Sequence, residues 1–318
     1  IVTGVQTCAL PISLVKYWRQ NAIDIVVYID DGFGLAKTLE QCERNSSLVR
    51  ATLANAGFVC NNEKSVWSPS KQLVWLGFLW DLENGIISIP EAKLVDISTR
   101  FAKCLALLPK FTSRELARLT GKVISLMPVF GDVCRLLTRN MYIQIQNNPV
   151  WDKTVKVFDD PGLVAELVFW RDNVQFFNSR NLQQELSPLI SVFSDASAIG
   201  CAAYIQGTTH VFHSTWNKSE RTFSSTWREL KVIELALHAF SPLLSNKLVK
   251  WFSDNKSCCR IATCGSFSTS LQKLALSIFR CARRYNIHLE FCWIPRTEND
   301  KADSLSKFQE DRKSTRLN

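Results

Sequence analysis

The chain has 318 residues, of which 46% are hydrophobic and 11% aromatic. That length and composition suit two ordinary domains with buried cores and exclude an intrinsically disordered chain. There are 38 Lys and Arg against 29 Asp and Glu, so the formal net charge is +9. A basic surface favours polyanionic partners, of which nucleic acid is the commonest.

The cysteines and the apolar runs narrow the class of protein further. The 11 cysteines are an odd number and include no CxxC pair, and the four histidines follow no zinc-type pattern. We therefore expect reduced, mostly buried thiols in a reducing intracellular compartment, either cytoplasm or nucleus. No apolar run approaches the ~20 residues of a membrane span, so we expect no membrane partner.

Both ends of the sequence differ from the rest. Residues Ile1–Ile12 read IVTGVQTCALPI, which lacks the basic start and long apolar core of a secretion signal. This stretch and the final Asp311–Asn318 (DRKSTRLN) resemble sequencing-adapter DNA translated in frame. We expect both to be artefacts at the ends of a piece of a longer reading frame, and we predict the fold without them.

Strand signals dominate the chain up to residue 90, with one helix between them. An apolar, β-branched run ends in Asp30-Asp31-Gly32, which predicts a hairpin. Glu83-Asn84-Gly85 is a second hairpin signal. The predicted elements are strands Asp24–Ile29 and a partner through Leu35, a helix Thr38–Ala56 with Gly57 as its C-cap, and strands Leu73–Trp80 and Gly85–Ile89.

Helical signals dominate from residue 90 to residue 188. Pro90 opens one helix, and Thr112-x-x-Glu115 is a capping-box pattern that begins another. Residues Asn147–Pro188 are mixed and partly polar, which predicts a connecting region. The predicted helices are Pro90 to about Leu108, Thr112 through Met127 and Leu163–Phe176.

The carboxy-terminal part has the clearest pattern, with three successive strands before alternating helices and strands. This order, βββαβαβα, describes a mixed sheet with helices packed on it. In the first helix, one face carries Leu230, Ile233, Leu237 and Phe240. The predicted strands are Leu189–Ser194, Gly200–Gln206, Thr209–Ser214, Leu248–Ser253 and Ile287–Trp293, and the predicted helices are Thr226–Phe240, Lys256–Thr263, Ser270–Tyr285 and Asn299–Lys307.

Four acids in this part occupy structurally awkward positions. Asp195 and Asp254 each end an apolar strand, Glu229 lies one residue off an apolar helical stripe, and Asp303 begins the last turns of the final helix. Four converging carboxylates repel one another unless cations neutralise them. A two-magnesium site needs such hard oxygen ligands. Any single Asp at a strand end can simply be a turn residue, but four on these elements predict a metal site.

Residues Ser194–Ser306 resemble a retroelement ribonuclease H. The resemblance is carried by SDAS at 194–197, RELKVIELAL at 228–237, SDNKS at 253–257 and ENDKADSLSK at 298–307. It implies cleavage of RNA paired to DNA, with two Mg²⁺ (or Mn²⁺ in their place) held by Asp195, Glu229, Asp254 and Asp303. Glu234 matches a structural position of the same helix.

The sequence departs from the family pattern in one loop. Relatives often carry a histidine before the last helix, but here the loop reads IPRTEN. We expect His288, in the preceding strand, to be a packed side chain. Four basic residues of one long helix could hold the phosphate backbone, or could form an ordinary solvated face. They are Lys273, Arg280, Arg283 and Arg284.

Tyr28-Ile29-Asp30-Asp31 resembles the YIDD turn of a reverse transcriptase. NNEKS at 61–65 and LVWLGF at 73–78 resemble the segments that follow it in that family. The resemblance implies metal binding by Asp30 and Asp31, with template RNA and DNA primer as partners. It also implies that Lys64 faces the incoming nucleotide and that Trp75, Gly77 and Phe78 support the primer end. TGKVISL and CRLLTRNMY resemble the DIRS-like, tyrosine-recombinase group of retrotransposons, with the gypsy-type group as the alternative.

These resemblances imply a fold class and a domain order. The fold is α+β and α/β: a truncated palm over 13–90, a helical thumb and connection over 91–146, a connecting region over 147–187, and a ribonuclease H-like mixed-sheet domain over 188–308. RNA-directed DNA polymerase activity belongs to the full-length parent, and we expect none from this fragment alone, because the other palm aspartate and the fingers are missing.

Two other readings remain open from the sequence. The chain could be a nucleic-acid-binding retroelement remnant that has lost catalysis, although its acids are intact. It could also be another nuclease of the same fold, such as an integrase or transposase, although those lack the RELKVIELAL-type helix. Hybrid cleavage distinguishes all three.

Overall fold

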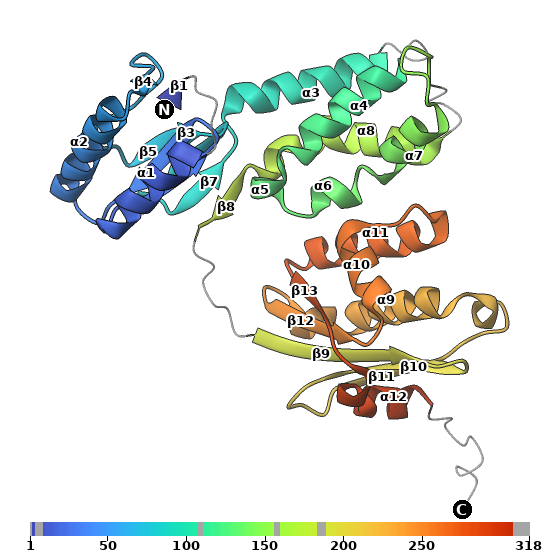
Figure 1. The fold of residues 1–318 in the computed structure, drawn as a ribbon. Helices are drawn as coiled ribbons and strands as arrows, with labels where there is room; N and C mark the ends of the chain where they lie inside the picture. Colours follow the sequence, from blue (N-terminus) through green and yellow to red (C-terminus); the bar gives the residue numbers. More distant parts are fainter. Residues whose placement is uncertain (1, 4–8, 107–110, 156–159, 183–188, 308–318) are drawn as a thin grey trace, which may run out of the picture. The chain divides into compact units, whose positions relative to one another are not determined.

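The computed structural model describes residues 2–3, 9–106, 111–155, 160–182 and 189–307 (Figure 1). It divides into two compact units, one of residues 1–93 with 178–183 and one of residues 94–177 with 184–318. Among the described helices, none combines the length and the apolar character that crossing a bilayer requires.

Among the described residues, the first unit contains the helices α1 and α2, two two-stranded antiparallel sheets and one four-stranded antiparallel sheet. Its apolar core is formed by Trp18, Ile23, Ile25, Val49, Leu53 and Phe58. The predicted hairpin and helix are confirmed, and Gly57 follows the helix with φ +81°. The elements are α1 (Ala9–Gln20), the pair β2 (Asp24–Tyr28) and β3 (Asp31–Leu35), α2 (Leu39–Asn55), and β1 (Val2–Thr3) paired with β4 (Val59–Cys60).

The prediction of one strand over Leu73–Trp80 is wrong. The chain turns at Leu76 and Gly77, which both have positive φ, at +50° and +75°. A tight hairpin turn favours that backbone conformation, and Gly adopts it without steric cost. The resulting four-stranded sheet has the order β5 (Gln72–Trp75), β6 (Phe78–Asp81), β7 (Ile86–Ser88) and β8 (Ser179–Asn181).

Strand β8 was not predicted. It lies inside the expected connecting region and pairs with β7, so that Ile87 lies opposite Arg180. Its three residues, SRN, are all exposed and carry no alternating pattern. Residues 178–183 therefore belong to the first unit although they follow the helices of the second.

Helices form the first part of the second unit, as expected. The capping box is present: Thr112 N donates to Glu115 Oε2 at 2.9 Å, and Glu115 N donates to Thr112 Oγ1 at 3.3 Å. The helix that it begins ends at Ile124, earlier than predicted. The helices are α3 (Glu91–Ala106, which starts in the first unit), α4 (Ser113–Ile124), α5 (Met127–Phe130), α6 (Val133–Leu136), α7 (Arg139–Asn147) and α8 (Pro161–Asn173).

The rest of the second unit is the predicted mixed-sheet domain, and the expected fold class is confirmed. The strand order is β11-β10-β9-β12-β13, with β9, β12 and β13 parallel and β10 antiparallel to both neighbours. The strands are β9 (Leu189–Ala196), β10 (Gly200–Ile205), β11 (Val211–Thr215), β12 (Leu248–Ser253) and β13 (His288–Trp293). The helices are α9 (Ser225–Leu244), α10 (Lys256–Cys264), α11 (Thr269–Arg284) and α12 (Asp300–Ser306).

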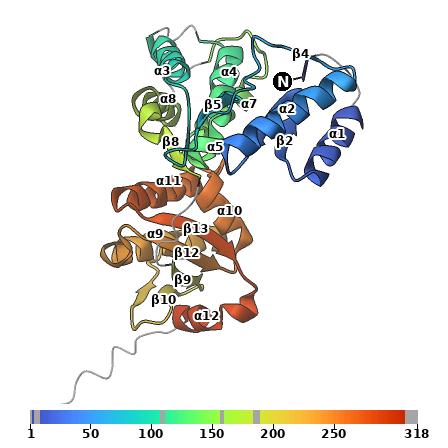
Figure 2. The same ribbon diagram turned by 90° about the vertical axis from the view of Figure 1, so that its left-hand side faces the viewer.

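Helices cover both faces of this sheet. Figures 1 and 2 show α9, α10 and α11 on one side and the short α12 on the other. The predicted stripe of α9 is buried against the sheet: Leu230, Ile233 and Leu237 are fully buried, and Phe240 is 5% exposed. Val192 and Trp251 in the two central strands are also fully buried. The core therefore holds β9, β12 and α9 together, which are the elements that carry the acids.

The structure describes part of the amino-terminal segment and none of the carboxy-terminal one. Strand β1 and the start of α1 lie within Ile1–Ile12. Residues Asp311–Asn318 lie outside the described part of the chain. The proposal that both ends are artefacts stays a prediction.

Replacing Thr112 with Ala should lower the free energy of unfolding by about 1 kcal/mol, because the helix α4 loses its N-cap oxygen. Thr112→Ser keeps that oxygen and should stay within about 0.5 kcal/mol of the original protein. Denaturant unfolding of both variants measures the difference. An equal loss in both would contradict the capping role.

Candidate metal centre

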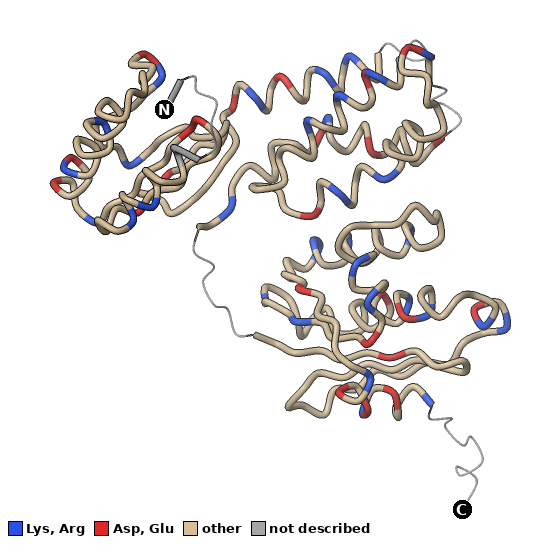
Figure 3. The backbone as a smooth tube through the Cα atoms, viewed as in Figure 1, with Lys and Arg blue, Asp and Glu red and all other residues tan. Residues whose placement is uncertain are grey.

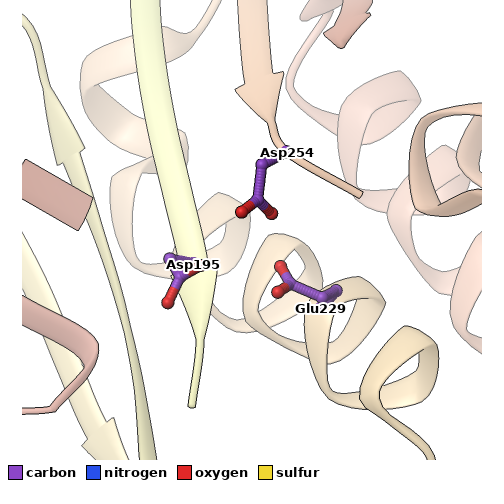
Figure 4. A group of neighbouring side chains, drawn as sticks. All are labelled: Asp195, Glu229 and Asp254. Carbon is purple, nitrogen blue, oxygen red and sulfur yellow. The ribbon is translucent and has the colours of Figure 1, made fainter. Parts of the chain in front are cut away.

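Three of the predicted acids meet at one edge of the mixed sheet. Asp195 lies near the end of β9, Asp254 directly follows β12, and Glu229 lies in the second turn of α9. Strands β9 and β12 are parallel neighbours in which Phe193 lies opposite Phe252. Their carboxyl ends therefore deliver both aspartates to the same place, where Figure 4 shows Glu229 beside them.

The three carboxylates are close enough to share a cation. One oxygen of each lies within 4.8 Å of an oxygen of the others. Asp195 is 5% exposed and Glu229 is 6% exposed, whereas Asp254 is half-buried. Two of the three carboxylates are therefore buried inside the fold, and the third is partly open to solvent.

Buried polar contacts fix the strand that carries Asp195. Its neighbour Ser194 accepts a hydrogen bond from Trp251 Nε1 at its side-chain oxygen, at 2.9 Å, and one from Asn299 Nδ2 at its carbonyl, at 3.0 Å. The Ser306 hydroxyl lies 2.6 Å from Asp195 Oδ2, to which it donates. Sequence reasoning missed these supporting residues, although Ser194, Asn299 and Ser306 all lie inside the quoted motifs.

Burial and mutual repulsion disfavour negative charge at this site. Burial, followed by the nearby Asp254 and Asp303, raises the pKa of Asp195, while the Ser306 hydrogen bond lowers it. Burial, Asp195 and Asp254 raise the pKa of Glu229 well above its ordinary value. Without a counterion, the folded protein must hold several carboxylates in a place where their charged forms are unfavourable.

Glu229 offers the clearest fit to a cation. Its Oε2 atom is buried and has no hydrogen-bond partner among the described residues. A buried charged oxygen without a partner is costly, and a hard divalent cation would satisfy it. All three candidate ligands are carboxylates, which suits Mg²⁺ or Mn²⁺ and not a soft metal. The residues present therefore fit the predicted ions.

Asp303, the fourth predicted ligand, lies outside this group. Arg296 NH2 donates to its Oδ1 at 2.9 Å, and Lys307 Nζ donates to its Oδ2. These hydrogen bonds, Lys307's first, lower the pKa of Asp303. It is near enough to influence the pKa of Asp195. The structure thus places Asp303 beside the site, with cations as its partners.

Two further predicted side chains have different outcomes. Glu234 pairs with Lys231 on the same helix at 2.6 Å, away from the carboxylate group. The prediction that His288 is a packed side chain is wrong, because it is exposed. Strand β13 lies at an edge of the sheet. Its first residues alternate between exposed and half-buried side chains, and His288 is one of the exposed ones.

The four predicted basic residues of α11 are all exposed. The helix buries its Leu274, Ile278 and Cys281 face. Arg283 lies over the ring of Phe177, with its guanidinium carbon 4.6 Å from the ring centre. Figure 3 shows that Lys and Arg also occur on the helices of the first unit, so α11 is not the sole carrier of positive charge. The exposed residues are Lys273, Arg280, Arg283 and Arg284.

The predicted polymerase residues lie in the first unit. The hairpin turn comprises Ile29 and Asp30, since Tyr28 pairs with Asp31. Asp30 is exposed and Asp31 half-buried, and neither belongs to a possible metal-binding group among the described residues. The turn thus lies one residue earlier than predicted, with Asp30 in the turn and Asp31 at the start of β3, and among the described residues the two acids assemble no metal centre.

The other predicted nucleic-acid-binding residues of that unit include several that contact neighbouring side chains or form a turn. Trp75 stacks on Phe33, with ring centres 5.1 Å apart, and Lys93 lies 5.2 Å from the ring centre of Phe78. Gly77 is the turn residue described above. Lys64 is exposed and, with Trp75, lines a largely apolar cavity of about 200 Å³.

Comparisons with known proteins show a likeness of fold alone. No family model matches the sequence, and no curated protein does. A foamy viral protease-reverse transcriptase in complex with an RNA/DNA hybrid is 16% identical over 99% of this chain and 40% of that one, with a TM-score of 0.47. The same viral protein in complex with dsDNA is 16% identical over 90% of this chain and 57% of that one, at 0.46.

Shorter proteins align with a third of the chain. An RNase H1 from the halophilic archaeon Halobacterium salinarum NRC-1 is 13% identical over 37% of this chain and 94% of that one, with a TM-score of 0.32. The chain spans about half the length of the viral structures, between 40% and 57%. At these identities and TM-scores, function has to be argued from the site itself.

Adding Mg²⁺ should stabilise the protein, because the ion binds the folded carboxylate group. The expected gain is about 2.7 kcal/mol at a hundredfold excess over the dissociation constant. Asp254→Asn should abolish that gain, and in EDTA it should not be less stable than the original, since one repelling charge is gone. Thermal unfolding with and without Mg²⁺ measures both effects.

Glu290→Gln is the matched control for this experiment. Glu290 is an exposed acid on β13 outside the carboxylate group, so its variant should keep the full Mg²⁺ effect. Loss of the effect in the control, or its survival in Asp254→Asn, would reject the metal site.

Proposed function

We propose that the mixed-sheet domain, residues 188–308, is a ribonuclease H-type endonuclease that hydrolyses RNA paired to DNA. The observation that carries this proposal is the meeting of Asp195, Glu229 and Asp254, drawn from distant parts of the sequence, in one group of carboxylates within 4.8 Å of one another. A carboxylate group that could hold hard divalent ions suits phosphodiester hydrolysis. The motifs around these acids point to the hybrid as substrate.

The chain's own residues have separate tasks in this proposal. Asp195 and Asp254 would hold the ions at the strand ends, and Glu229 would bind them from the helix α9. The contacts of Ser194 with Trp251 and Asn299 keep Asp195 in place. When bound, two Mg²⁺ neutralise the phosphate charge and make a hydroxide nucleophile available at neutral pH.

Recognition of the substrate would rest mainly on shape and backbone. An RNA strand differs from DNA by its 2′-hydroxyls, which are displayed in the wide minor groove of an A-form duplex. Exposed Lys273, Arg280 and Arg284 of α11 supply charge for phosphate contacts. Contacts of this kind carry little sequence information, so we propose weak sequence preference.

The origin of the whole chain is proposed from the sequence motifs. The first unit would be a remnant of a reverse transcriptase palm, with residues 91–146 as thumb and connection, in a DIRS-like retrotransposon polyprotein. A gypsy-type origin is the alternative. The YIDD sequence at Tyr28–Asp31, which lies at the end of a hairpin with Asp30 exposed, supports this assignment.

A labelled RNA–DNA hybrid should be cut in its RNA strand when Mg²⁺ is present and left intact in EDTA. Asp195→Asn and Asp254→Asn should each lower the cleavage rate by at least about 100-fold, because each removes a proposed ligand. Glu290→Gln should cleave like the original protein. Equal cleavage by all variants would refute the assignment.

The same assay separates the alternatives. Binding of the hybrid without cleavage would indicate an inactive nucleic-acid-binding remnant. Cleavage of duplex DNA in preference to the hybrid would indicate a nuclease of the integrase or transposase class.

A further inference from the structure

An exposed tryptophan lies directly beside the loop that carries Asp254. Strand β13 runs parallel to β12, and Trp293 lies opposite Ser253 at their carboxyl ends. The indole Nε1 of Trp293 donates a hydrogen bond to the carbonyl oxygen of Asp254 at 2.9 Å. The next residue, Ile294, donates from its backbone N to Ser253 O at 3.1 Å. Contacts with backbone atoms therefore hold the ring at the edge of the carboxylate group.

Trp293 keeps much of its surface open to solvent. Its exposed fraction is 49%, although its indole N–H already has a partner. Single exposed apolar side chains are common on proteins and need no functional explanation. Trp293 differs from such cases because it lies beside three acids that could hold divalent ions, and because a cation accompanies it.

That cation is Lys256, the first residue of α10. Its Nζ atom lies 5.6 Å from the centre of the Trp293 ring, and its side chain is exposed. Only Asn255 separates it from Asp254, and the Asn255 side chain caps the helix by accepting from Cys258 N at 3.0 Å. The cap fixes the backbone of Lys256 close to Asp254. An aromatic ring and an ammonium group thus form one surface, the Trp293–Lys256 patch.

We propose that the Trp293–Lys256 patch binds the sugar–phosphate backbone of the RNA strand at the carboxylate site. The ring of Trp293 would pack against a ribose, and the ammonium group of Lys256 would bind a neighbouring phosphate. This contact rests on the proposed function, because the strand that is cut has to lie at the acids, and the patch touches the loop of Asp254.

The chemistry of a base-paired duplex supports a contact with the sugar. The bases are stacked on one another, so a side chain outside the duplex reaches sugars and phosphates first. An apolar ring can cover the C–H groups of a ribose, and an exposed lysine can neutralise a phosphate. An indole has a single donor, and that of Trp293 is already used on Asp254. The patch therefore adds affinity and leaves recognition of the 2′-hydroxyl to other groups.

The test measures the affinity of the full chain for a fluorescently labelled RNA–DNA hybrid, by anisotropy in EDTA at several salt concentrations. Lys256→Gln should weaken binding roughly fivefold and reduce the salt slope by about 1, as expected for one lost phosphate contact. Trp293→Leu should weaken binding roughly fivefold at an unchanged salt slope, because the lost contact carries no charge. An unchanged dissociation constant in either variant would overturn the proposed contact.

Trp293→Phe separates the ring contact from the hydrogen bond to Asp254. Phe keeps an aromatic ring but cannot donate to the carbonyl, whereas Leu lacks both the ring and the donor. Trp293→Phe should therefore retain most of the affinity that Trp293→Leu loses. Equal losses in the two variants would mean that Trp293 acts only by holding the Asp254 loop, and the ring contact would be wrong.

The matched controls lie elsewhere in the second unit. Trp151 is 50% exposed, and the guanidinium carbon of Arg114 lies 6.0 Å from its ring centre, so Trp151→Leu removes an equivalent ring. Lys218→Gln removes an exposed cation after β11. Both controls should bind the hybrid like the original protein. Losses as large as those of the patch variants would show that any exposed ring or cation has the same effect, which contradicts a specific patch.

The cleavage assay distinguishes failure of this contact from failure of the proposed function. If Trp293→Leu and Lys256→Gln bound the hybrid like the original protein while Asp195→Asn lost cleavage, the contact alone would fail. If the original chain neither bound nor cut the hybrid, the function and the contact would both fail.

Discussion

The parallel pairing of β9 with β12 is the constraint on which the site depends, because it forces two carboxylates together. The strand register places Phe193 opposite Phe252, so Asp195 and Asp254 lie at the same edge of the sheet, where α9 adds Glu229. Two like charges about 5 Å apart repel by roughly 3 kcal/mol at an effective dielectric constant of about 20. Fully burying one large apolar side chain contributes about 1.5–3 kcal/mol. A core that includes buried Trp251, Val192 and Leu230 is therefore needed to hold the acids in place.

The short helix α12 completes this arrangement from the other face of the sheet. It brings Ser306 to Asp195, and the carbonyl of Ser306 also accepts a hydrogen bond from Ser197 at 2.8 Å. Gly200 makes the approach possible, because a Cβ there would lie 2.8 Å from Ser214 O and 3.2 Å from Ser306 O. The same helix carries Asp303, which pairs with Lys307, so one element both supports Asp195 and places a fourth acid near the group.

Much of the fold could be predicted because its elements follow local rules. The 3.6-residue stripe of α9, the capping box at Thr112 and the apolar runs of β9 and β12 are all found where the periodicity placed them. The errors occur where a local signal is weak or overridden. The turn at Leu76 and Gly77 interrupts an apolar run without any polar residue to mark it. Strand β8 is three polar residues long and exists only because β7 pairs with it.

By itself, the sequence determined which residue types were available: acids at two strand ends and on one helix, within recognisable motifs, in a basic chain. Only the tertiary structure decided which of them lie close together. It brought Asp195, Glu229 and Asp254 within 4.8 Å of one another, gave Asp303 contacts with Arg296 and Lys307, and exposed His288 on an edge strand. The reason is that strand order and helix packing set the distances between residues far apart in the chain, and electrostatic interactions depend on those distances and on burial.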